Sequence, residues 1–171
     1  VDINKAKIAA LMHDYSKYDN LEDNLDLLTY DEKEECIKYP FMLHAYLSAK
    51  NYKKLLGNDE EIYNAIRYHI FGKPHMNMLE KIIMIADYTE ETRTYPSCIE
   101  CRKILLNGNL DLAIYKSLAF TKEHIIKDGG ILHPLQEEVY NEYKEIISKI
   151  KKEDLILDAL NKIKAFDIIS Y

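Results

Sequence analysis

Four stretches of this chain repeat apolar residues with the period of an α-helix, and each carries a histidine or an aspartate on its apolar side. In one of them, Ile62, Ala65 and Ile66 precede His69 at the spacing i, i+3, i+4, i+7. Residues at this spacing share one helix face, so His69 is predicted to point into the core. A carboxylate that faces a core is costly unless it is paired, protonated or bound to a cation. The pattern predicts a helical bundle around a metal-binding cluster, whose members are His13, Asp14, His44, His69 and Asp87.

The composition fits a single globular domain. The 171 residues are 47% hydrophobic and 30% charged, and they include only five glycines and four prolines. No apolar stretch approaches the roughly 20 residues of a membrane helix, and no secretory signal opens the chain, so no membrane partner is expected. Three cysteines, an odd number, favour a reducing cytoplasm over a disulfide framework. The net charge of −6 argues against a nucleic-acid partner.

Helices are the only regular elements predicted with clear boundaries, so the fold class is all-α. Two capping boxes support the assignment, one at Asn58 and Glu61 and one at Asn77 and Glu80. Residues 18–38 are predicted to form a turn and one or two short helices. The tail has a helical pattern over 155–163, and residues 166–171 fit either a strand or a loose end. The division is a domain over 1–152 and a tail over 153–171. The predicted helices are 3–15, 41–56, 58–70, 78–89, 97–106, 110–127 and 134–151.

The ligand types favour a pair of divalent metals. Asp14 can bridge two metals because a carboxylate has two oxygens, whereas an imidazole nitrogen has one lone pair. His13 and Asp87 could then hold one metal, and His44 and His69 the other. Mixed histidine and carboxylate ligation suits iron, manganese or zinc better than calcium or magnesium. Such metals activate water, which predicts a hydrolase with Asp14 in a catalytic role.

Cations near these ligands are candidates for binding phosphate. Lys17 follows His13 by about one helical turn and could also stabilise charge as a bond breaks. Arg67, Lys73 and Arg93 flank the loops around the cluster. Each of the four also suits an ordinary solvated position.

Other polar residues are interpreted as structural. His75 is expected in a loop, His124 on a helix surface and His133 as a cap before a proline. The lone CxxC of Cys98 and Cys101 is weak evidence for zinc or redox chemistry, because no second pair accompanies it.

Several segments resemble the HD-domain phosphohydrolases, and more specifically their YqeK-type branch, the symmetrical bis(5'-nucleosyl)-tetraphosphatases of bacteria. The likeness runs from about residue 1 to residue 151 with its spacing preserved. The segments that carry it are residues 9–17, which include Leu11-Met-His-Asp-Tyr-Ser-Lys17, together with 43–45, 65–69 with Gly72, 79–88 and 132–134.

The resemblance implies an HD-domain helical bundle with a dinuclear metal site in its core, containing iron or a similar metal. It implies hydrolysis of diadenosine tetraphosphate to two ADP, often by a homodimer. Matched residue by residue to the family's motifs, this sequence again has the metal ligands His13, Asp14, His44, His69 and Asp87. Lys17 and Arg67 match positions expected near the phosphates, and Gly72 belongs to a matching segment.

Two departures accompany the likeness. The family has a further ligand histidine on a helix that precedes Val1, so we expect the chain to be truncated at its N-terminus. The family also usually has a small residue where His75 stands, so the rim of the pocket is expected to differ.

Two rival functions stay open from the sequence. Metal ligands do not recognise the leaving group, so another HD activity, such as a nucleotidase or a cyclic-nucleotide phosphodiesterase, would use the same residues. A nucleotide-binding sensor without catalysis is the alternative from a different class. Turnover with added metal separates the sensor from the enzymes.

Overall fold

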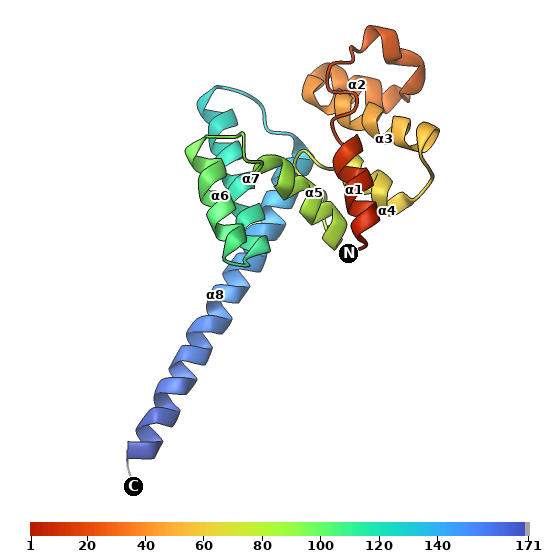
Figure 1. Ribbon diagram of the computed structural model, residues 1–171. Coiled ribbons are helices and arrows are strands. Elements are labelled where there is room, and N and C mark those ends of the chain that lie inside the picture. Colours follow the sequence, from red (N-terminus) through yellow and green to blue (C-terminus); the bar gives the residue numbers. More distant parts are fainter. Residues whose placement is uncertain (170–171) are drawn as a thin grey trace.

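The computed structural model describes the backbone of residues 1–169 and the side chains of residues 1–157, and within these ranges every regular element is a helix. Figure 1 shows two groups of helices that meet at α5, with α8 extending away from the body. The prediction of an all-α fold is confirmed. The elements are α1 (Ile3–Met12), η1 (Glu22–Leu27), α2 (Tyr30–Lys38), η2 (Pro40–Met42), α3 (Leu43–Leu55), α4 (Glu60–Arg67), α5 (Met78–Tyr88), α6 (Pro96–Leu106), α7 (Leu110–Lys127) and α8 (Pro134–Ile169).

The N-terminal group packs around one apolar core. Helices α1, α3, α4 and α5 contact one another, and Met12, Ile66 and Leu79 are buried between them. Helix α4 is strongly amphipathic, and its buried side carries Ile62, Ala65 and Ile66, as the periodicity predicts. The helical face that leads to His69 is therefore the face that packs.

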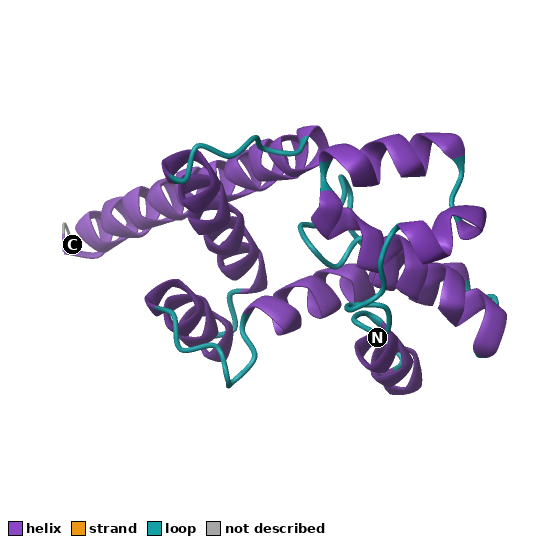
Figure 2. Cartoon of the chain, turned by 90° about the horizontal axis from the view of Figure 1, so that it is seen from above, coloured by secondary structure: helices purple, strands orange, loops and turns teal. Residues whose placement is uncertain are grey.

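A second core joins α3 and α5 to the C-terminal helices. It contains Leu47 from α3, Met84 from α5, Ile114 from α7 and Val139 from α8. Helix α5 contributes to both cores, so its C-terminal end lies where the two groups of helices meet (Figure 2).

A buried ion network ties α2, α4 and the start of α8 together. Glu35 accepts a hydrogen bond from the Tyr46 hydroxyl, and its Oε1 lies 2.6 Å from Nε2 of His133. The guanidinium of Arg67 lies over the Tyr46 ring, 3.3 Å from the centroid, with Nη2 3.7 Å from Glu35 Oε2. His133 also accepts a hydrogen bond from the Leu135 N–H, which confirms its predicted role as a cap.

Several helix boundaries differ from the prediction, among them the end of α4, which lies at Arg67 and not at residue 70. The N-cap of α4 is Asp59, not Asn58, because Asp59 accepts hydrogen bonds from the backbone of Glu61 and Ile62 and also pairs with Lys5 of α1. Helix α1 ends at Met12, so His13 and Asp14 lie in the turn that follows it. The capping box of Asn77 and Glu80 at α5 is confirmed.

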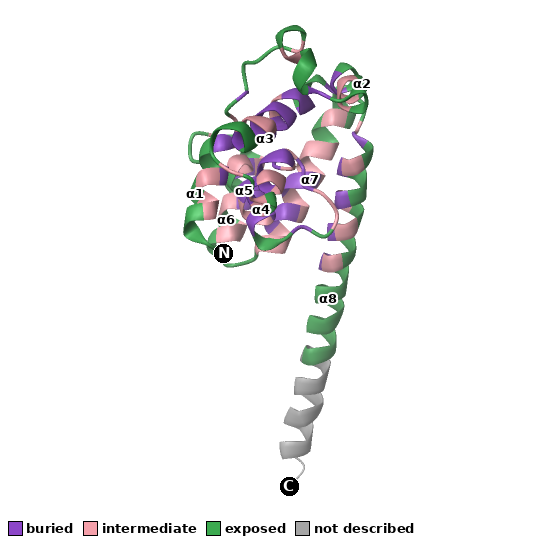
Figure 3. Cartoon of the chain, turned by 90° about the vertical axis from the view of Figure 1, so that its right-hand side faces the viewer, coloured by how far each residue is buried: buried purple, intermediate pink, exposed green. Residues whose placement is uncertain are grey.

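The tail is one continuation of α8. The helix runs unbroken through residues 151–154 to Ile169, which contradicts a strand over 166–169, and residues 170–171 lie outside the described part. No proline or glycine interrupts this stretch. Figure 3 shows that the part of α8 that leaves the body is exposed as far as its burial is described, over residues 148–157.

We expect removal of residues 153–171 to leave stability nearly unchanged. Residues 153–157, the part of the tail whose burial is described, are all exposed and belong to neither core. Thermal unfolding should shift by no more than about 2 °C, since ~0.5 kcal/mol corresponds to roughly that shift in a domain of this size. Tyr143→Ala, at a residue 1% exposed in the second core, should cost ~3 kcal/mol by comparison. A large loss of stability on truncation would contradict the exposed placement of the tail.

Candidate metal centre

Five candidate ligands converge from the ends of four helices. His13 and Asp14 follow α1, His44 lies in the first turn of α3, His69 follows α4, and Asp87 is the second-last residue of α5. Their donor atoms form two groups, His13 with Asp14 and Asp87, and Asp14 with His44 and His69. These are the two groups that the sequence predicts, and their role as metal ligands remains a prediction.

Asp14 belongs to both groups because its two oxygens face in different directions. Its Oδ2 lies 3.6 Å from Nε2 of His13, and its Oδ1 lies 3.5 Å from Nε2 of His44 and 3.8 Å from Nε2 of His69. Nε2 of His13 lies 3.8 Å from Oδ1 of Asp87. Ligands with metal bonds of ~2.0–2.2 Å lie roughly 3.0–3.5 Å apart, so these separations of 3.5–3.8 Å are within a few tenths of an ångström of those in a metal site. The carboxylate of Asp14 is placed to bridge.

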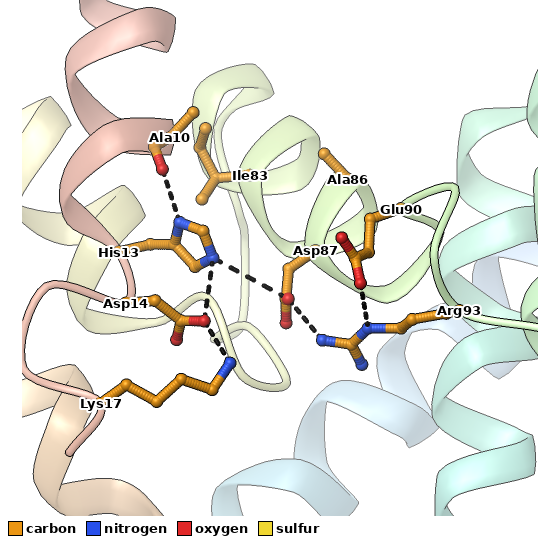
Figure 4. Close-up of a pocket in the computed structure, with 9 residues that line it drawn as sticks. All are labelled: Ala10, His13, Asp14, Lys17, Ile83, Ala86, Asp87, Glu90 and Arg93. Carbon is orange, nitrogen blue, oxygen red and sulfur yellow. Dashed lines mark hydrogen bonds and ion pairs between the residues drawn. The ribbon is translucent and has the colours of Figure 1, made fainter.

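Backbone carbonyls orient two of the imidazoles. Nδ1 of His13 donates to the carbonyl of Ala10 at 2.7 Å, and Nδ1 of His69 donates to that of Ile66 at 2.8 Å. A carbonyl can only accept, so the proton lies on Nδ1 and the Nε2 lone pair faces the cluster. Metal-binding histidines commonly have such a partner on the second nitrogen. Figure 4 shows the ring of His13 held between Ala10 and the two carboxylates.

The carboxylates are ionised in this environment. Burial alone would raise the pKa of Asp14, but the hydrogen bond from Lys17 and the neighbouring positive charges outweigh it, and the net shift is downward. Burial is likewise the largest influence on Asp87, and His13 and Arg93 more than compensate, so the pKa of Asp87 is also lowered. Ionised carboxylates are the form that binds a cation.

The histidines divide between two protonation tendencies. Burial lowers the pKa of His69 to about 4 and lowers that of His44 as well. Burial also opposes the charge on His13, but the Asp87 carboxylate and the contact with Ala10 raise its pKa overall. His44 and His69 are therefore neutral and ready to bind a metal at neutral pH, whereas protons compete more strongly with a metal at His13.

Two adjoining cavities open on the cluster. One of about 270 Å³ is lined by His13, Asp14, Asp87 and Arg93, and Figure 4 shows these side chains around it. The other, of about 280 Å³, contains His44 and His69 and also reaches Arg93. Lys17 lines both cavities and forms an ion pair with Asp14, and Arg93 Nη2 lies 2.5 Å from Asp87 Oδ1.

The structure separates the remaining phosphate candidates from the cavities. Arg67 is 7% exposed in the network with Glu35, and Lys73 pairs with the buried Glu80 at 3.3 Å. Gly72 has φ of 80°, and a Cβ there would lie 2.6 Å from the Met76 sulfur, so this position needs glycine for the backbone alone. None of the three lines either cavity beside the cluster.

The second cavity also contains polar residues that the sequence analysis missed. Ser117, Thr121 and Gln136 line it from α7 and α8. Gln136 is 2% exposed, and within the described part of the chain its Nε2 has no hydrogen-bond partner. A buried donor without a partner costs roughly 1–3 kcal/mol, so Gln136 is a candidate to bind an oxygen of a ligand. No local pattern marks it, because the cavity forms only when α8 packs on α7.

The other histidines and the cysteines lie outside the cluster. His75 is exposed in a loop and His124 on the surface of α7, as predicted. Cys98 and Cys101 are buried on α6 as free thiols, and burial raises the pKa of Cys101 to about 12. Cys101 is therefore a protonated packing residue.

Comparison with known proteins gives a consistent result. Residues 1–92 match the family model of the HD domain. The symmetrical bis(5'-nucleosyl)-tetraphosphatase of Bacillus subtilis strain 168 is 34% identical over 143 residues, which covers 82% of this chain and 76% of the relative. The enzyme of the same name from Staphylococcus aureus strain NCTC 8325 / PS 47 is 32% identical over 154 residues, covering 88% and 79%.

A solved structure supports the same fold. The crystal structure of an HD superfamily hydrolase from Clostridium acetobutylicum, described as involved in NAD metabolism, superposes with a TM-score of 0.75. It is 34% identical and covers 84% of this chain and 78% of that one. Within the described residues, this chain has no helix long and apolar enough to cross a membrane.

We expect Asp14→Ala to lower metal content and activity together. The substitution removes the carboxylate whose two oxygens face both groups of ligands, so both metal positions should be weakened. Elemental analysis of protein purified without chelator checks the metal content, and circular dichroism checks the fold. Asp154→Ala, at an exposed aspartate of α8, is the matched control and should change neither. Full metal content in Asp14→Ala would contradict the bridging assignment.

Proposed function

The chain belongs to the HD domain family of hydrolases, and from that premise we propose that it cleaves diadenosine tetraphosphate symmetrically into two molecules of ADP. The main support for this proposal is the position of the Asp14 carboxylate, which faces two sets of candidate ligands. Lys17 and Arg93 line the same cavities. A polyphosphate needs concentrated positive charge, and this is where the chain provides it. The relatives named as symmetrical tetraphosphatases support the choice of substrate.

The proposed centre would hold two divalent metals. Asp14 would serve both, with His13 and Asp87 as further ligands on one side and His44 and His69 on the other. Iron is our first choice, with manganese or zinc as alternatives, because the donors are imidazoles and carboxylates. A bound metal pair would polarise phosphoryl oxygens and lower the pKa of water to near neutrality. Donor separations of 3.5–3.8 Å around Asp14 support this assignment.

The side chains around the centre divide the work of hydrolysis. Water attacks an inner phosphorus, the bond to the bridging oxygen between the two central phosphates breaks, and one ADP departs with the added negative charge on its terminal oxygen. Lys17 can stabilise that charge, because its ion pair with Asp14 holds the ammonium at the proposed centre. Arg93 binds the phosphate chain from the side of Asp87, and Gln136 donates its unpartnered N–H to a phosphate oxygen.

We also propose that the protein forms the homodimer implied by the family resemblance. A measurement of its molecular mass in solution tests this proposal. The assignment of residues 1–152 as the catalytic unit is a further proposal, and the truncated chain described above tests it if activity is measured beside stability.

The product pattern tests the reaction itself. We expect chromatography of diadenosine tetraphosphate treated with the full chain to show ADP alone, because symmetrical cleavage produces two identical halves. Protein stripped with a chelator is the control and should leave the substrate intact. ATP and AMP together would contradict symmetrical cleavage, and hydrolysis of only mononucleotides or cyclic nucleotides would favour another HD activity.

Lys17→Met tests the role of the lysine. It keeps most of the side-chain length and removes the charge, so metal content should stay nearly the same. A charge-assisted contact contributes roughly 1.5–3 kcal/mol, so its loss at the transition state should lower kcat/KM by about tenfold to hundredfold. Steady-state kinetics measure the change, with Lys149→Met on exposed α8 as the matched control. If kcat/KM is unchanged, Lys17 is an ordinary solvated residue, and Arg93 is then the candidate for stabilising the charge.

A further inference from the structure

A recess of about 770 Å³ lies beside the candidate metal centre, between the segment that follows α5 and the C-terminal half of α7. It shares Tyr88, Arg93 and Thr121 with the wall of the cavity that contains His44 and His69. The recess therefore adjoins that cavity, with these three residues between them. Its volume falls within the range of about 300–1000 Å³ that is typical of sites for small ligands.

The lining of the recess combines aromatic and charged residues: Tyr88 lies with Arg93 at the shared wall, and Glu123 and Lys127 line the part beyond it. Arg93 lies at the shared wall, where it pairs with Asp87. The aromatic residues Tyr95 and Phe120 line the part that the second cavity does not reach. A cation at the shared wall with two rings beyond it suits a ligand in which a phosphate chain leads to a flat base.

Tyr95 is the ring best placed to accept such a base. It is 70% exposed, although it lies in the wall of a recess. Among the described residues it takes part in none of the close aromatic or cation–π contacts, whereas the Phe120 ring has the Lys116 ammonium 5.4 Å from its centroid. An exposed ring without a partner offers a face on which a base can stack.

We propose that this recess binds one adenosine of the substrate, with the base stacked on Tyr95. The proposal rests on the hydrolase function proposed above and adds to it the residues that recognise the nucleoside. Thr121 offers a hydroxyl at the junction, and Lys127 adds a positive charge at the rim. The phosphates then extend past Arg93 toward the centre.

Binding of two probes separates recognition of the base from recognition of the phosphates. Calorimetry of the full chain, purified without chelator, would measure the affinity for ADP and for inorganic pyrophosphate. We expect Tyr95→Ala to weaken the binding of ADP by about fivefold to hundredfold, the range typical for loss of one base–aromatic stack. Pyrophosphate should bind as it does to the wild-type protein, because it has no base. Tyr95→Phe should restore ADP binding, since it keeps the ring.

Tyr30→Ala is the matched control, because Tyr30 is 74% exposed at the start of α2, away from the recess. Unchanged ADP affinity in Tyr95→Ala would overturn the proposal, as would an equal loss for pyrophosphate or a wild-type protein that binds no ADP. Hydrolysis of diadenosine tetraphosphate by the wild-type protein is measured in parallel. If hydrolysis is absent while ADP binding depends on Tyr95, the proposed reaction is wrong and the nucleoside site stands.

Discussion

The rest of the structure depends on how the negative charges of Asp14 and Asp87 are compensated. Both carboxylates are largely withdrawn from water and yet ionised, because Lys17 and Arg93 pair with them and imidazoles surround them. Such charges are tolerated only where compensation is held in place. The helices supply that rigidity: α1, α4 and α5 contact one another and present their C-terminal ends to one point. Stability and site geometry therefore rest on the same packing.

Helix α5 connects this constraint to the substrate. Its first turns pack into the core with α1 and α4, its later residues pack against α7, and it ends with Asp87 and Tyr88. Asp87 faces the candidate metals, and its neighbour Tyr88 lines the recess proposed for adenosine. One helix end thus places the chemistry and the binding of the nucleoside next to each other, which supports cleavage at a fixed distance from the base.

Local patterns predicted which candidate ligands would lie close together, because each lies at or next to the end of a helix that packs in the core. The periodicity of α4 places His69, and that of α5 places Asp87, without knowledge of the rest of the chain. Non-local contacts decided what the patterns missed. Asp59 displaced Asn58 as a cap in part because Lys5 of α1 pairs with it. Gln136 joins the site only through the packing of α8, so no spacing near His69 or Asp87 could identify it.

Two arginines that look equivalent in the sequence have different surroundings. Arg67 is enclosed by Tyr46 and Glu35, where it links helices, whereas Arg93 lies where the two cavities and the recess meet. The match to the HD domain covers residues 1–92, which include every candidate metal ligand and Lys17 but end just before Arg93. Tyr95 and Gln136 also lie beyond it. The candidate metal ligands therefore lie within the matched domain, whereas the residues proposed to contact the substrate away from the metals lie in the segments that follow it.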